Sequence, residues 1–189
     1  MPADIQSLPE LKLLYDSYSA VYADAQLFMS GVTEAQAAWR PSPAAWCIAE
    51  CLDHLALTNR IYIRAMQCAA AAARGANKLR RRPALPGFLG AWFVRSLEPP
   101  IKLKIKSPKS IKPRTAPALA DASTAFLASH TEAQNFLRAN ADLDLAAISF
   151  ANPFLKGVRF TLATGLYVIP AHERRHLHQA RAVLNAMPR

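Results

Sequence analysis

Glycine, cysteine and long apolar runs are all scarce in this sequence. Its six glycines form no phosphate-binding loop, which argues against nucleotide binding of that kind. The longest stretch without a charged residue, Phe160 to His172, is shorter than the roughly 20 apolar residues of a membrane-spanning helix. Three cysteines and an N-terminus without a basic region before an apolar core predict neither a disulfide framework nor a signal peptide. We therefore expect a cytoplasmic protein.

Acidic residues are also few, and the resulting positive charge is concentrated in one segment. The chain has 23 basic and 13 acidic residues, for a net charge of +10. Residues 74–114 carry most of the excess, with Glu98 as their one acid. The same region is rich in proline, which lacks the N–H that a helix interior needs. We predict that 79–116 is a long and mostly non-helical connection, with a short amphipathic helix near 88–97 and an extended run at 101–106.

Elsewhere the apolar residues recur at helical spacing. A hydrophobic fraction of 52% and a charged fraction of 19% are typical of a globular chain. Thr33 to Gln36 has the capping-box pattern of a short helix, and Pro170 should kink the last helix or mark its true start. The fold class that we predict is all-α, a single domain over 1–189 built as a four-helix bundle with the 79–116 crossover between its second and third helices. The four long helices are expected at about Pro9 to Ser30, Cys47 to Ala73, Pro117 to Asn140 and Thr161 to Met187.

The sharpest chemical signal lies in the last helix, which contains His172 and His176. A spacing of four residues places the two imidazoles on one face, about 5–6 Å apart at their Cβ atoms, where they can share a metal ion. Apolar residues of the helix lie on the same side, so the pair should face the edge of the core. The alternative is two histidines with ordinary hydrogen-bond partners. His178 falls on the opposite side and is expected to be solvated.

The same stretch matches H-E-x-x-H, the zincin pattern in which the glutamate is the base of a metalloprotease. No third ligand follows at the longer metzincin spacing, and a helical bundle is not the expected fold of such an enzyme. Glu173 lies inside the apolar arc of its helix. We therefore favour a structural role for Glu173, as the ion-pair partner of an arginine on a neighbouring helix.

A third ligand is needed for a catalytic metal site, and His54 is the best candidate. It lies on the apolar face of the second helix, whereas Asp53 falls among the outward-facing residues. A lone histidine on such a face is more often a core residue, but two inward-facing histidine sites in one bundle favour a shared metal ion. His130, in the third helix, has no partner at helical spacing and is expected to be exposed.

The residues around His54 resemble a known family. The run from Trp39 to Leu55 resembles the W-x-P…W-S-I-x-E-x-x-x-H-L signature of the DinB-like (DinB/YfiT) superfamily, and His172 to Gln179 resembles its closing H-x-x-x-H-x-x-Q motif. Asn152-Pro153 is similar to the family's loop before the last helix. The resemblance implies a four-helix bundle with a three-histidine metal site. By position, the metal ligands are His54, His172 and His176.

The sequence departs from this pattern at Cys47, where the family usually has serine. Glu50, three residues later, can still complete a capping box by accepting from the Cys47 backbone N–H. Cys47 shares a stripe with Cys51 and His54, so thiolate ligation of the metal stays an alternative. Buried cysteines more often simply pack against their neighbours.

Characterised relatives include transferases and isomerases that use low-molecular-weight thiols. The resemblance therefore implies a metal-dependent enzyme, with zinc or nickel and a low-molecular-weight thiol as cofactors and a small molecule as substrate. The alternatives are a non-catalytic metal-binding bundle, or a protein that binds a polyanion or a membrane through the basic 74–114 segment. A nucleic-acid partner is disfavoured because the segment matches no such motif. A homodimer is compatible with the sequence.

Overall fold

The computed structural model describes residues 5–100 and 111–188. The described chain is mostly helical, with one short two-stranded sheet, and the prediction of an all-α four-helix bundle with a long crossover is confirmed. The predicted extended run at 101–106 lies outside the described residues. The elements are a 3-10 turn at Ile5–Ser7, α1 at Pro9–Ser30, α2 at Glu34–Ala38, α3 at Ile48–Gly75, α4 at Phe88–Leu97, α5 at Leu119–Ala139, β1 at Ser149–Ala151, β2 at Arg159–Thr161 and α6 at Leu162–Asn185.

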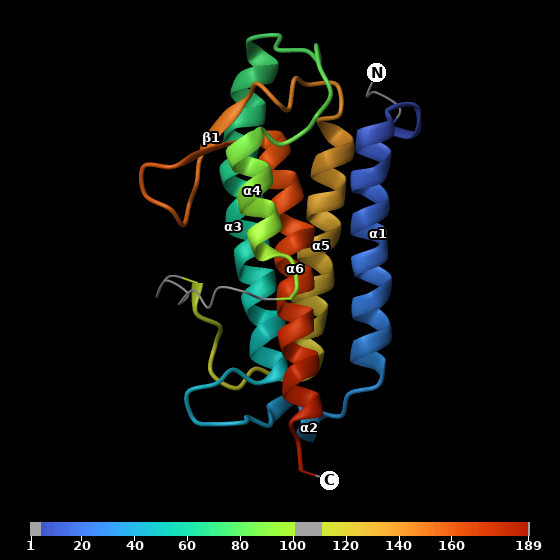
Figure 1. Ribbon diagram of the computed structural model, residues 1–189, viewed down its shortest axis with the longest axis vertical. Coiled ribbons are helices and arrows are strands. Elements are labelled where there is room, and N and C mark those ends of the chain that lie inside the picture. The colour runs from blue at the N-terminus through green and yellow to red at the C-terminus, as the bar shows by residue number, and fades with distance from the viewer. Residues whose placement is uncertain (1–4, 101–110, 189) are drawn as a thin grey trace.

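Four long helices, α1, α3, α5 and α6, lie side by side along the long axis (Figure 1). The colour gradient shows that α3 and α5 run in the same direction, while α1 and α6 run in the opposite one. Because α3 and α5 are parallel neighbours, the chain between them must return along the full length of the bundle. This geometry explains the long crossover. The short helix α4 forms part of the return and packs against α6.

Local signals in the sequence set several helix ends. Thr33 and Gln36 form the expected capping box at the start of α2. Cys47 is the N-cap residue of α3, and its backbone N–H donates to a Glu50 carboxylate oxygen at 3.1 Å. Pro170 does not mark the start of α6, which begins eight residues earlier at Leu162.

The two short strands were not anticipated from the sequence. β1 and β2 form an antiparallel hairpin in which Phe150 pairs with Phe160. Its connecting loop contains the Asn152-Pro153 pair. The Asn152 side chain organises the loop, because its Oδ1 accepts from the backbone N–H groups of Phe154 and Leu155.

The core is divided into two apolar clusters by a buried polar layer. One cluster surrounds Met66 in the half where α3 ends, and the other surrounds Leu52 in the half where α3 begins. Between them, three helices contribute polar side chains that are buried at the same level. These are Asn59 from α3, Ser129 and His130 from α5, and Glu173 from α6. Since His172 adjoins Glu173, the candidate site lies at the level of this layer.

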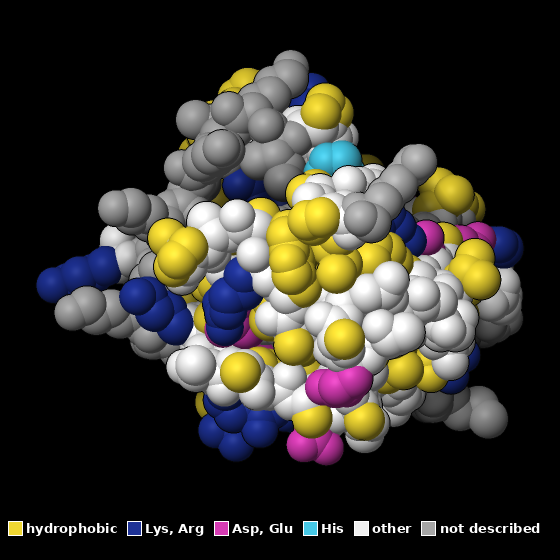
Figure 2. Space-filling model, turned by 90° about the horizontal axis from the view of Figure 1, so that it is seen from below, with side chains coloured by type: hydrophobic (Ala, Val, Ile, Leu, Met, Phe, Trp, Pro, Cys, Tyr) yellow, Lys and Arg dark blue, Asp and Glu magenta, His cyan; other side chains and the backbone are white. Residues whose placement is uncertain are grey.

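Ion pairs attach the described parts of the crossover region to the rest of the bundle. Arg80, Arg82 and Arg114 each meet an acidic residue elsewhere in the chain, and Glu98 meets Arg174. In the view from the lower end, hydrophobic side chains gather near the middle and several Lys and Arg side chains lie toward one side (Figure 2). Part of the positive charge of the basic segment is therefore paired with acidic residues of the same chain.

No helix among the described residues is both long and apolar enough to cross a membrane.

Candidate metal centre

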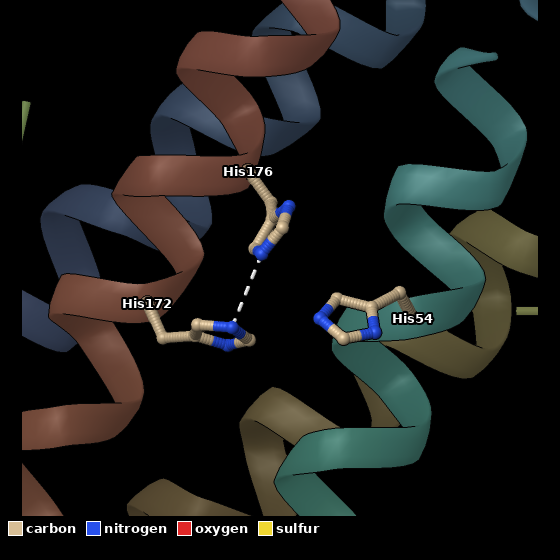
Figure 3. A group of neighbouring side chains, drawn as sticks. All are labelled: His54, His172 and His176. Atoms are coloured by element: carbon tan, nitrogen blue, oxygen red, sulfur yellow. Dashed lines mark hydrogen bonds between the residues drawn. The ribbon is translucent and has the colours of Figure 1, made fainter. Parts of the chain in front are cut away.

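Three histidine side chains meet between α3 and α6. His54 comes from α3, and His172 and His176 come from successive turns of α6 (Figure 3). Their nearest ring nitrogens all lie within 4.8 Å of one another. The structure thus brings together the three residues that were selected from the sequence. In the described part of the chain, no other set of three histidine, cysteine or acidic side chains converges in this way.

The orientation of His54 is set by a hydrogen bond on the far side of its ring. Its Nδ1 lies 2.7 Å from the carbonyl oxygen of Ile111, at the end of the crossover. A carbonyl only accepts, so Nδ1 carries the proton and Nε2 keeps a lone pair. Figure 3 shows the other nitrogen of the ring pointing toward the two histidines of α6. Trp46 lies against the ring, with 4.8 Å between centroids.

The two histidines of α6 face each other through their Nε2 atoms, which are 3.1 Å apart. His176 Nδ1 lies 3.0 Å from the side-chain oxygen of Gln179, so the proton of a neutral His176 ring sits on Nδ1 and its Nε2 presents a lone pair. That lone pair needs either a proton from His172 or a cation. A second lone pair, that of His54, is directed at the same place, and a single proton cannot satisfy both.

Burial keeps all three imidazoles neutral at physiological pH. It lowers the pKa of His172 to about 3, with a further contribution from the proximity of His54 and Arg175. Burial also lowers the pKa of His176 well below its usual value and lowers the pKa of His54. Neutral imidazole is the form that binds metal ions. Each of the three rings therefore has an unprotonated nitrogen that can bind a cation, and no proton has to be released first.

The donor set fits a small divalent ion. Two imidazole nitrogens bound to one tetrahedral zinc ion at about 2.0–2.1 Å lie about 3.4 Å apart. The 3.1 Å between the two Nε2 atoms of α6 is close to this value. Among the described residues, the converging group contains no cysteine or carboxylate. Burial raises the pKa of the Cys47 and Cys51 thiols, which disfavours the thiolate form that ligation requires.

Two expectations about individual residues were wrong. His130 is fully buried, because Tyr18 and Tyr22 of α1 and Phe126 of α5 enclose its ring. Asp53 is 7% exposed and is covered by Arg114 of the crossover. In both cases a helix or segment remote in sequence covers the residue, so the periodicity of its own helix could not reveal it. His178 is exposed, as expected.

Glu173 is completely buried, but its partner is not an arginine. One carboxylate oxygen accepts from the Asn59 side chain at 2.7 Å, and the other lies 2.9 Å from His130 Nδ1. Both oxygens are therefore engaged away from the histidine cluster. This arrangement differs from the zincin pattern, in which the glutamate acts on a water molecule at the metal.

The hydrogen bond between His54 and the backbone carbonyl of Ile111 was also not predicted from the sequence. No pattern in the sequence identifies such a contact.

Comparison with known proteins places the chain in a family. A family model described as the DinB superfamily matches residues 17–180, a range that contains α3, α5, the hairpin, and α6 through Ala180. No curated protein and no solved structure shows a significant match. The matched range includes all three histidines of the cluster and both motifs that surround them. The chain belongs to the DinB superfamily.

Proposed function

We propose that this protein binds one divalent metal ion through His54, His172 and His176 and acts on small molecules as a metal-dependent enzyme. The observation that carries the proposal is the convergence of three neutral imidazoles, two of which have hydrogen bonds on their outer nitrogens and lone pairs turned inward. Membership of a superfamily with many metal-dependent enzymes supports it. We expect zinc or nickel as the metal.

The two helices contribute different parts of the proposed site. His172 and His176 share one face of α6 and present adjacent nitrogens. His54 completes the set from α3, and Trp46 covers its ring and approaches that of His176. Three protein ligands leave a coordination position open, which distinguishes catalytic from structural zinc sites. When bound, the ion supplies Lewis acidity that lowers the pKa of a water or thiol at that position.

Among reactions, we propose thiol-dependent transfer or isomerisation, with a low-molecular-weight thiol as cosubstrate. The support is the family resemblance, together with a donor set of neutral ligands that leaves the positive charge of the ion undiminished. A cytoplasmic location would supply such a thiol in reduced form. We propose no catalytic base, because both carboxylates adjacent to the ligands are engaged, Glu173 by Asn59 and His130 and Asp53 by Arg114.

The engagement of Glu173 favours one alternative, a metal-binding bundle without catalysis. Cobalt substitution separates the two functions, because the absorption of Co²⁺ changes when a sulfur donor enters its coordination sphere. The proposed enzyme should show a new charge-transfer band when millimolar glutathione or cysteine is added to the Co²⁺ protein, and the His172→Ala variant should not. A Co²⁺ spectrum unaffected by thiols, with no turnover across thiols and electrophiles, would support the alternative.

A further inference from the structure

The end of the crossover, residues 111–114, is attached to α3 beside the candidate metal site. Its first contact is made by Ile111, whose side chain is buried and whose carbonyl oxygen accepts from His54 Nδ1 at 2.7 Å. The carbonyl thus fixes which nitrogen of His54 carries the proton. A ring with Nδ1 protonated presents its Nε2 lone pair to the histidines of α6.

A second contact follows three residues later, at Arg114. Its backbone N–H donates to one carboxylate oxygen of Asp53 at 2.8 Å. Its side-chain Nε and Nη2 donate to the other oxygen at 2.8 and 2.6 Å. Asp53 precedes His54 in α3, so two consecutive helical residues hold this short piece of chain. The buried carboxylate receives three hydrogen bonds from one residue, an arrangement stronger than an ordinary surface ion pair.

We propose that Asp53 and Arg114 are positioning residues for His54. By fixing the crossover end, they keep the Ile111 carbonyl where it selects the tautomer and ring orientation that the metal site needs. This inference rests on the proposed metal-binding function. Partners that orient a ligating histidine through its second nitrogen typically change metal affinity by about 10–100-fold when they are lost. Asp53 and Arg114 do not touch His54 in this role. They act on it indirectly, by holding the Ile111 carbonyl in place.

Metal binding and attachment of the crossover end should strengthen each other. If attachment of the crossover end strengthens metal binding at His54, metal binding must strengthen attachment of the crossover end by the same factor. An ion pair with only a structural role would show no such coupling. The bond after Arg114 is a trypsin site, so the coupling can be measured as protection of that bond by metal.

A matched control exists in the same chain. Arg74 and Asp142 form another arginine–aspartate pair, with two hydrogen bonds of 2.8 and 2.9 Å. That pair joins the opposite end of α3 to the residues after α5. It resembles the Arg114 pair in chemistry but makes no contact with a histidine of the cluster. Arg74→Ala therefore reports what the loss of a surface arginine does by itself.

The experiment is a Zn²⁺ titration against a competing chelator, using the full chain and the variants Asp53→Ala, Arg114→Ala and Arg74→Ala. Asp53→Ala should weaken Zn²⁺ binding about 10-fold. Arg114→Ala should weaken it less, since its backbone N–H remains, and Arg74→Ala should change it less than twofold. Zn²⁺ should slow tryptic cleavage after Arg114 in the wild type and in Arg74→Ala, and slow it less in Asp53→Ala. Zn²⁺ affinities within twofold of wild type for both Asp53→Ala and Arg114→Ala would overturn the proposal.

A metal-free measurement separates this inference from the proposed function. In ¹⁵N spectra of the imidazole rings, His54 should be the Nδ1–H tautomer in the wild type and in Arg74→Ala, and a mixture of tautomers in Asp53→Ala. A wild type that binds no Zn²⁺ but shows this difference would refute the metal site and leave the positioning of His54 standing. An unchanged His54 tautomer in Asp53→Ala would count against the positioning role itself. Arg114, whose side chain is 64% exposed, provides a variant that should fold in either case.

Discussion

The hydroxyl of Tyr18 in α1 donates a 2.8 Å hydrogen bond to the backbone carbonyl of Leu166 in α6. Leu166 lies four residues before Pro170, so its carbonyl is the one that Pro170, without an N–H, leaves unpaired in the helix. Tyr18 is fully buried. The contact therefore satisfies the interrupted position of α6 and joins it to α1, which explains how a proline is accommodated inside this helix.

Tyr18→Phe should destabilise the protein by about 1–3 kcal/mol, because it leaves a buried carbonyl without a donor. Urea unfolding measures the change. Tyr15→Phe, which removes a hydroxyl that meets Arg138 at the surface, is the control and should cost less. In a Pro170→Ala background the restored N–H can pair with Leu166, so Tyr18→Phe should cost less there. Equal costs in the two backgrounds would contradict this account of the contact.

The inward position of the three histidines could be predicted from sequence because it depends only on helical periodicity. His54 and the His172–His176 pair each share a face with apolar residues, and a bundle turns such faces toward one another. The environments of His130 and Asp53 could not be predicted in this way. They depend on which remote segment covers them, and the crossover that covers Asp53 has no periodicity from which to infer its path.

The buried carboxylate of Glu173 should contribute to stability and to metal retention, not to proteolysis. Glu173→Gln weakens hydrogen bonds to a charged acceptor and should lower the free energy of unfolding by about 2 kcal/mol. The exposed Glu132→Gln, on α5, is the control and should have little effect. The measurements are urea unfolding and metal content. Peptide hydrolysis by the wild type that disappears in Glu173→Gln at unchanged metal content would contradict the assignment.

Stability of the metal-free protein should fall as pH decreases below about 6.5. Burial lowers the pKa of His172 to about 3 in the folded protein, whereas in the unfolded chain its pKa is about 6.5. Between these values the unfolded chain binds a proton that the folded one does not, so acid favours unfolding. Each such histidine contributes a slope of at most about 1.4 kcal/mol per pH unit.

Urea unfolding in the presence of a chelator, at pH 7.5 and 5.5, tests this dependence. His172→Asn should lose part of the pH dependence below pH 6.5. Identical pH profiles for wild type and His172→Asn would show that His172 titrates normally in the folded protein.

The basic segment should act as a crossover attached to the bundle and not as a nucleic-acid site. Arg80 pairs with Glu10, and Arg82 pairs with Asp144. Neutralising Arg80, Arg81 and Arg82 together should therefore lower stability, while wild-type binding to DNA at near-physiological salt should already be weak. Fluorescence anisotropy with labelled DNA at several salt concentrations measures this. Tight, steeply salt-dependent binding that the triple variant abolishes would favour the rival function.

The crossover also shows where sequence reasoning reached its limit. Its length and lack of long helices followed from proline and charge, and its 88–97 helix matches α4. The reason why the chain has a long crossover became clear only from the parallel arrangement of α3 and α5 (Figure 1). The β1–β2 hairpin was missed because its strands are three residues each, too short for an alternating pattern to be recognised.

The most direct test of the account is metal binding by the untagged chain, measured as bound metal per chain and by Zn²⁺ titration. The wild type should bind one Zn²⁺ per chain. His172→Ala should bind at least about 100-fold more weakly, because one of three protein ligands is lost. His178→Ala, which removes an exposed histidine of the same helix, should bind like the wild type. Undiminished Zn²⁺ binding by His172→Ala would contradict the central claim.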